Sequence, residues 1–259
     1  MKKLMHADLE RKYILYKPEN LPKESPLVVF LHWYTGNAQD IINFTDFNDI
    51  ADKYGFGVVY PEGLLDIHGN KHWNSNLDIS NFDDVGFIEL LVQTLVKEHH
   101  FNSKDIFVTG ISNGGFMSYS LANNIPHLFS AFAPVIGTMS KRDWKERTSK
   151  NPVPILHICG LDDEVVPPYK KNDEGEGWGG APNVDIIMRH WADKAGCDEP
   201  ITEQLGSKTT IDYYDNGIDD LEVWCVKISD HGHDYPTKKD DIDGGELLWR
   251  FFSKYVDNK

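Results

Sequence analysis

The sequence is poor in cysteine, and its three cysteines lie far apart. Cys159, Cys197 and Cys225 form no Cys-x-x-Cys pair, which argues against a zinc site, a redox motif or a disulfide framework. Cys159 and Cys225 stand within apolar, strand-like runs. Because a free cysteine behaves as a small hydrophobic residue, we expect these two thiols to be buried.

Basic residues are scarce relative to acidic ones. The chain has 26 Lys and Arg against 41 Asp and Glu, a formal net charge of −15 and an isoelectric point near 5.1. This charge repels nucleic acid and anionic membrane surfaces, so we expect neither as a partner. A neutral substrate is favoured, and the composition does not indicate an oligomeric state.

Long apolar runs are absent as well. No segment approaches the length needed to span a bilayer, and the basic start of residues 1–8 has no apolar stretch behind it. The chain as written is therefore expected to carry no export signal or anchor. Its 40% hydrophobic residues, seven tryptophans and lack of low-complexity stretches predict a single folded domain, residues 1–259.

Strand-like and helix-like segments alternate along the chain, a pattern that predicts a mainly parallel central sheet with helices on both faces. The segment 11–16 alternates in polarity as an edge strand would, whereas 27–31 is apolar throughout. The other predicted strands are 57–60, 105–109, 131–136, 154–159, 209–214 and 221–228, and the predicted helices are 41–54, 84–99, 113–122, 184–195 and 245–255. Residues 170–183 are polar and glycine-rich, which indicates a surface loop.

The pentapeptide Gly110-Ile111-Ser112-Asn113-Gly114 is the most informative motif. A predicted strand leads into it and a predicted helix follows it. A nucleophilic serine needs this context, because small residues on either side allow the sharp turn that exposes its hydroxyl group. Ser112 is therefore the candidate nucleophile.

A serine nucleophile needs a base and an acid, which follow it in the order acid, then histidine, on sheets of this kind. The acid is expected in the loop after the strand 154–159, where Asp162 and Asp163 stand side by side. The base is expected after the last strand, where His231 and His233 are two residues apart. Spacing alone leaves both choices open.

The chain resembles the polyhydroxybutyrate depolymerase-type esterases, which include feruloyl and acetylxylan esterases, over nearly its whole length. The motifs that carry the resemblance are Leu31-His32-Trp33-Tyr34-Thr35-Gly36-Asn37, Asp83–Phe87, Gly-x-Ser-Asn-Gly-Gly at 110–115, Gly160–Pro167, Gly232-His233-Asp234-Tyr235-Pro236 and Trp249–Phe252. The resemblance implies an α/β-hydrolase fold with Ser112, Asp163 and His233 as the catalytic triad.

The same resemblance implies where the oxyanion hole lies. One donor is the backbone N–H of Asn113, and the other is an N–H of the loop after strand 27–31, for which Tyr34 is chosen over Trp33. The chain departs from the family pattern at Trp33, where relatives usually have glycine. Two further departures are Cys159 in place of histidine and Tyr235 in place of tryptophan.

Other conspicuous residues are assigned simpler roles. His32 and His157 border or lie within apolar strands, so we expect them to be structural. Asp83 and Asp84 precede a predicted helix and suit its N-cap. Trp33, Trp73 and Trp178 are candidates for lining the substrate pocket.

The leading hypothesis is a serine carboxylesterase that acts on feruloyl or acetyl esters of plant polysaccharide through an acyl-enzyme, without a metal or organic cofactor. The alternatives are depolymerisation of short-chain polyesters such as polyhydroxybutyrate, a serine peptidase on the same fold, and a binding protein that kept the fold. The resemblance implies a secreted or periplasmic protein whose leader is absent from this chain, or a cytoplasmic one if Met1 is the native start.

Overall fold

The computed structural model describes residues 1–147, 150–169 and 182–257. Its main feature is a ten-stranded sheet in the order β1-β2-β4-β3-β7-β8-β9-β12-β11-β10. The six central strands from β4 to β12 run parallel, and antiparallel pairs flank them on both sides. The strands are β1 (Lys2–His6), β2 (Leu9–Tyr16), β3 (Leu27–Leu31), β4 (Gly57–Pro61), β7 (Ile106–Ile111), β8 (Ala131–Val135), β9 (Ile155–Gly160), β10 (Ile201–Leu205), β11 (Thr209–Tyr214) and β12 (Val223–Ile228).

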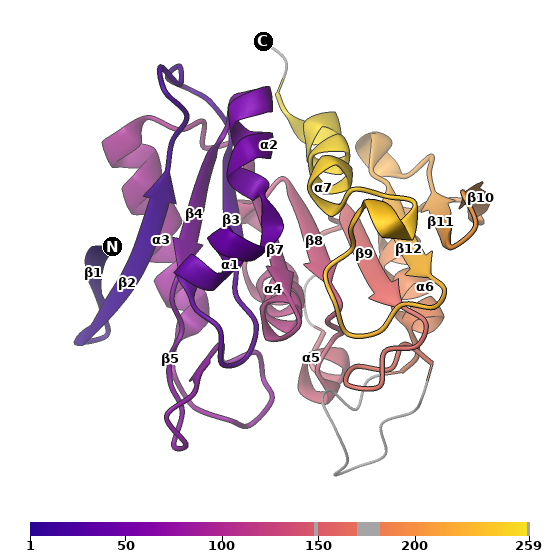
Figure 1. Ribbon diagram of the computed structural model, residues 1–259, viewed down its shortest axis with the longest axis horizontal. Coiled ribbons are helices and arrows are strands. Elements are labelled where there is room, and N and C mark those ends of the chain that lie inside the picture. Colours follow the sequence, from indigo (N-terminus) through magenta and orange to yellow (C-terminus); the bar gives the residue numbers. More distant parts are fainter. Residues whose placement is uncertain (148–149, 170–181, 258–259) are drawn as a thin grey trace.

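Helices cover both faces of this sheet, as predicted (Figure 1). The first face carries α3 (Asp84–His99), α4 (Asn113–Asn124) and α6 (Val184–Ala195), and the second carries α1 (Ala38–Thr45), α2 (Phe47–Tyr54) and α7 (Gly244–Phe252). The remaining short elements are β5 (Leu64–Leu65), β6 (Lys71–His72), α5 (Lys141–Lys145), and 3-10 turns at Pro126–Leu128, Ile218–Asp220, Lys238–Asp240 (η3) and Ser253–Tyr255.

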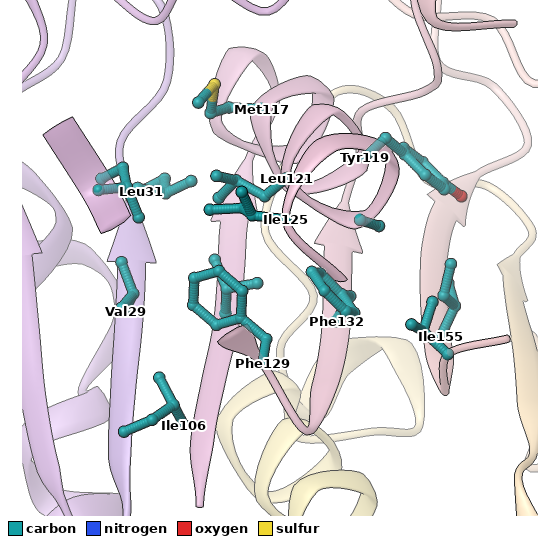
Figure 2. Packing of buried hydrophobic residues seen from close by; sticks show 14 of the residues in the cluster. Val29, Leu31, Ile106, Met117, Tyr119, Leu121, Ile125, Phe129, Phe132 and Ile155 are labelled. Atoms are coloured by element: carbon teal, nitrogen blue, oxygen red, sulfur yellow. The ribbon is translucent and has the colours of Figure 1, made fainter. Parts of the chain in front are cut away.

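The core consists of two apolar layers, one on each side of the sheet. Every residue of β3, β4, β7, β8 and β9 is buried, as expected for parallel strands that are covered on both faces. Figure 2 shows Leu31 of β3, Leu121 of α4 and Phe132 of β8, which belong to the layer on the first face. All three cysteines are buried and unbridged, which confirms the prediction made for Cys159 and Cys225.

Two predictions about the elements are corrected, and both edge strands of the sheet were missed. The segment 11–16 belongs to β2, which is not at the edge, because residues 2–6 pair with it as β1. A second unpredicted strand, β10, lies at the opposite edge. The predicted helix 41–54 is two helices, α1 and α2, because Asp46 adopts a left-handed conformation with φ 47° between them.

The two aspartates before α3 have different roles. Asp83 caps the helix by accepting a hydrogen bond from the Gly86 N–H at 2.9 Å. Asp84 is instead fully buried and pairs with Arg11 of β2 at 2.6 Å. The capping prediction is therefore confirmed for Asp83 and wrong for Asp84, whose carboxylate ties α3 to the sheet.

Among the residues that the structure describes, no helix is both long enough and apolar enough to cross a membrane.

Candidate active site

Ser112 lies at the sharp turn between β7 and α4. Its backbone has φ 53° and ψ −114°, a conformation that costs free energy for any residue other than glycine. The turn requires glycine on both sides, because a Cβ on Gly110 would collide with the Gly114 carbonyl and one on Gly114 with the Leu31 carbonyl. Close packing of α4 against β7 and β3 therefore holds the Ser112 hydroxyl at the end of the sheet.

The structure brings the serine, one histidine and one aspartate into a single chain of hydrogen bonds. His233 Nε2 lies 2.8 Å from Ser112 Oγ, and His233 Nδ1 lies 2.7 Å from Asp163 Oδ2. The three residues follow the carboxyl ends of β7, β9 and β12. Such a chain can move the serine proton to the imidazole ring while the carboxylate holds the ring in the required tautomer.

Asp163 is held by its own loop. Its carboxylate is buried, and its Oδ1 atom accepts hydrogen bonds from the backbone N–H groups of Val165 and Val166, both at 2.8 Å. This leaves Oδ2 for His233. Of the two aspartates that spacing left open, Asp163 faces the histidine, whereas the neighbouring Asp162 is exposed.

His231, the other candidate histidine, lies in a separate pair. Its Nδ1 atom is 3.1 Å from Asp240 Oδ1, and its Nε2 atom is 2.9 Å from the Asp234 carbonyl oxygen. Both ring nitrogens are thus engaged away from Ser112. The geometry brings His233, and not His231, to the serine.

His32 is a buried structural residue, as predicted, and it orients a peptide beside the site. Its Nδ1 atom is 2.7 Å from the Trp33 carbonyl oxygen, and its Nε2 atom accepts a hydrogen bond from the Gly63 N–H at 2.9 Å. Burial lowers the pKa of His32 to about 4, so the ring is neutral near pH 7. The neutral ring therefore donates from Nδ1 and fixes the plane of the peptide that joins Trp33 to Tyr34.

Asn113 and Trp73 form a buried, hydrogen-bonded pair next to Ser112. The Asn113 side chain accepts from the Trp73 N–H at 2.7 Å and donates to the Trp73 carbonyl and to Ser75 Oγ, both at 3.1 Å. Asn113 is also the first residue of α4, where a backbone N–H has no acceptor within its helix. This N–H can serve a ligand at the helix start.

The prediction that Trp73 lines the substrate pocket is corrected. Its side chain is fully buried, and its indole N–H donates to the His32 carbonyl at 2.9 Å. It packs on the His32 ring with 4.9 Å between ring centroids. Trp73 is thus a buried residue that packs against His32, next to the site. The other predicted pocket residue, Trp178, lies outside the described residues.

A cavity of about 310 Å³ opens at the serine. Trp33 and Tyr34, both predicted to lie at the site, line this cavity. The Tyr34 hydroxyl donates a hydrogen bond to Asp66 at 2.7 Å. The full lining comprises one serine, one histidine, one aspartate and seven aromatic or aliphatic residues: Ser112, His233, Asp234, Trp33, Tyr34, Phe44, Tyr235, Ile111, Ile136 and Val165. The cavity wall is therefore largely apolar, as is usual for small-molecule sites.

Phe44 is the one prominent cavity residue that the sequence reasoning missed. It projects from α1 with half of its surface exposed, and its ring makes an edge contact with Trp33 at 5.4 Å. Tyr235 lies 6.3 Å from Phe44, measured between ring centroids. The sequence could have indicated Phe44, because it is an aromatic residue that lies outside the buried face of the amphipathic helix α1. Ala38, Ile41 and Thr45 form that buried face.

A family model described as Esterase PHB depolymerase matches residues 11–144, just over half of the chain. A bifunctional acetylxylan esterase/xylanase of Neocallimastix patriciarum is 26% identical over 252 residues, which cover 93% of this chain and 33% of that protein. Acetylxylan esterase A of Talaromyces purpureogenus is 30% identical over 121 residues, 45% of this chain and 31% of that protein. The matches thus span about a third of the length of these relatives.

Solved structures show the same fold. An acetyl xylan esterase from Aspergillus awamori superimposes with a TM-score of 0.67 and 18% identity, covering 93% of each chain. A carboxylesterase of Bacillus cereus has a TM-score of 0.61 and 14% identity, covering 93% of this chain and 94% of its own. These likenesses confirm the predicted α/β-hydrolase fold.

Proposed function

Because the chain belongs to the Esterase PHB depolymerase family, we propose that it hydrolyses carboxylic esters with Ser112 as the nucleophile. His233 is the general base, and Asp163 orients it. The observation that carries this proposal is the continuous chain of hydrogen bonds from Asp163 through His233 to Ser112, since His233 and Ser112 both line the cavity.

The reaction has two halves. His233 Nε2 takes the proton as Ser112 Oγ attacks the ester carbonyl, and the tetrahedral intermediate collapses when His233 gives that proton to the leaving alcohol. Water then attacks the acyl-serine with His233 again as the base. The acid leaves, Ser112 regains its proton, and the reaction needs no reactant besides the ester and water.

We place the oxyanion between the backbone N–H groups of Asn113 and Tyr34. Because His32 holds the Trp33 carbonyl, and a trans peptide directs its C=O and N–H groups in opposite directions, the Tyr34 N–H is turned away from His32. Tyr34 lines the cavity that holds Ser112. These observations support Tyr34 over Trp33 as the second donor, with His32 as the residue that orients it.

His32→Phe tests this role. The variant keeps a ring for packing on Trp73 but leaves the Trp33 carbonyl and the Gly63 N–H without their partner. We expect kcat to fall about 10- to 100-fold with KM nearly unchanged. A misplaced Tyr34 N–H stabilises the transition state less well than an aligned one, but the loss is smaller than if the donor were removed. Steady-state kinetics on a soluble ester measure this.

The matched control for His32 is His157→Phe, which removes another buried histidine whose ring nitrogen bonds the Tyr119 hydroxyl at 2.9 Å. Both variants are expected to lose about 1 to 3 kcal/mol of unfolding free energy for a buried group left unpaired. An unchanged kcat in folded His32→Phe would contradict the orienting role.

For the substrate, we propose acetyl or feruloyl esters of plant polysaccharide. Trp33, Phe44 and Tyr235 form an aromatic wall beside Ser112, and aromatic faces suit both sugar rings and a feruloyl ring. Relatives named acetylxylan esterases support the same class. The family description also names polyester depolymerisation, which is the second candidate.

Phe44→Ala separates recognition of the large substrate from the chemistry. We expect kcat/KM to fall about 3- to 10-fold on acetylated xylan or methyl ferulate, because one aromatic contact contributes about 0.5 to 1.5 kcal/mol. Hydrolysis of ethyl acetate, which is too small to use the wall, should change less than twofold. Release of acetate or ferulate is the readout.

Ile201→Ala, which removes an exposed side chain from the distant edge strand β10, is the control for Phe44→Ala and should leave all rates unchanged. Equal losses on large and small esters would contradict a recognition role for Phe44. Turnover of polyhydroxybutyrate but not of acetylated or feruloylated substrates would favour the depolymerase, and cleavage of amides alone would overturn the esterase proposal.

A further inference from the structure

We propose that His231 is a positioning residue whose side chain holds the turn that presents His233. This inference rests on the proposed role of His233 as the general base. The observation behind it is a second histidine–carboxylate pair, His231 with Asp240, two residues from the first.

The His231 ring links residue 231, which precedes His233 in sequence, to two residues that follow it. Its side chain is 8% exposed, its Nε2 atom lies 2.9 Å from the Asp234 carbonyl, and its Nδ1 atom lies 3.1 Å from Asp240 Oδ1. Both partners are hydrogen-bond acceptors. Each contact is therefore one that a ring N–H of His231 can make.

The His231 side chain joins the two ends of the turn formed by residues 231–234. A backbone hydrogen bond within the turn, from the Asp234 N–H to the Gly232 carbonyl at 3.0 Å, spans three residues. The His231 ring closes the wider step from residue 231 to residue 234, across His233. The contact thus joins residues i and i+3, which a backbone hydrogen bond joins in an ordinary four-residue turn.

Asp240 links the His231 ring to the central sheet. Its Oδ2 atom accepts from the Thr237 N–H at 2.9 Å, and its carbonyl accepts a hydrogen bond from Thr209 Oγ1 of β11. Asp240 belongs to η3, in the long connection between β12 and α7 (Figure 1). The His231 ring is thereby fastened to a strand rather than to a free loop.

The main chain of His231 also meets the loop that carries the catalytic acid. Its carbonyl accepts a hydrogen bond from the Asp162 N–H at 3.0 Å, one residue before Asp163. His231 therefore contacts the acid loop through its backbone and the far side of the His233 turn through its ring. This places it where it can set the separation between Asp163 and His233.

His231→Phe tests the proposal, because phenylalanine keeps a ring but cannot donate to Asp234 or Asp240. We expect kcat on a soluble ester to fall about 10- to 100-fold with KM within twofold, since a displacement of about 1 Å at a catalytic group costs up to 100-fold. The low-field proton resonance of the His233 Nδ1–H bonded to Asp163 should shift or broaden. A purely structural histidine would alter neither kcat nor that resonance in the folded protein.

Two further variants keep the test decisive. Asp240→Asn retains an acceptor oxygen while removing the charge, so it should fold and show a smaller loss of kcat in the same direction, about threefold or more. His157→Phe controls for loss of any buried histidine and should keep both kcat and the resonance. If His231→Phe fails to fold, Asp240→Asn alone decides.

Wild-type kcat and an unshifted resonance in folded His231→Phe, or in Asp240→Asn where the first does not fold, would overturn the positioning role and leave the esterase proposal intact. Absence of ester hydrolysis in the unmodified protein would instead overturn the proposed function itself. The two failures are therefore distinguishable.

Discussion

Ser112→Ala is expected to lower kcat for ester hydrolysis by about a millionfold, the loss typical of removing the nucleophile of a serine hydrolase. The alanine methyl group cannot form the acyl-enzyme, and His233 loses the proton that it takes at 2.8 Å. The structure should persist, because the Ser112 backbone keeps its hydrogen bond to Val135 at 2.9 Å. Initial rates on p-nitrophenyl acetate and circular dichroism of both proteins measure these two outcomes.

Ser118→Ala is the matched control, because Ser118 lies in α4, the helix that begins directly after Ser112. Its hydroxyl bonds only the Gly114 carbonyl in the described structure. The variant should retain activity within severalfold. A fluorophosphonate probe should add to the unmodified protein and to Ser118→Ala but not to Ser112→Ala, as read by intact mass. Labelling of Ser112→Ala, or activity above about one per cent, would show that another residue is the nucleophile.

Asp163→Asn is expected to lower kcat by about 10⁴-fold, because it forces His233 into the wrong tautomer. The backbone N–H groups of Val165 and Val166 both donate to Oδ1, so they hold the amide oxygen of the new asparagine at that position. Its NH₂ group then faces His233 Nδ1, which must accept. Nε2 consequently carries the proton and cannot take another from Ser112. Steady-state kinetics near pH 7 provide the measurement.

Asp162→Asn provides the comparison for Asp163→Asn, because the neighbouring carboxylate is exposed and the substitution is chemically identical. Its rate should stay within twofold of the unmodified protein. A larger loss in Asp162→Asn than in Asp163→Asn would reverse the assignment of the catalytic acid.

The buried elements were predictable because their residues carry the signal themselves. The segments 184–195 and 209–214 were expected as a helix and a strand, and they are α6 and β11 with the same bounds. The edge strands β1 and β10 were missed because none of their residues is buried. Their strand conformation comes from pairing with β2 and β11, which is a long-range contact without a local pattern.

The break between α1 and α2 has a similar origin. The apolar spacing of 41–54 fits one helix, yet Asp46 turns the chain so that Ile41 and Phe47 can both be buried. Phe47 packs between Phe30 and Phe56, with ring centroids 5.1 and 5.5 Å away. Packing against the sheet, and not helix propensity, set this boundary.

For the site, the sequence by itself indicated the candidate nucleophile, the order of the candidate serine, acid and base, and the family. It did so because a strand-to-helix turn between glycines and loops after apolar strands are local features. Spacing could not separate Asp163 from Asp162 or His233 from His231, because each pair shares one loop, and the choice of Asp163 and His233 came from the resemblance to a family. The tertiary structure shows that His233 faces Ser112 and that Asp163 faces His233, because β7, β9 and β12 bring together residues that are 121 and 70 positions apart. The burial of Trp73 and the exposure of Phe44 were decided in the same way, by what packs against each ring.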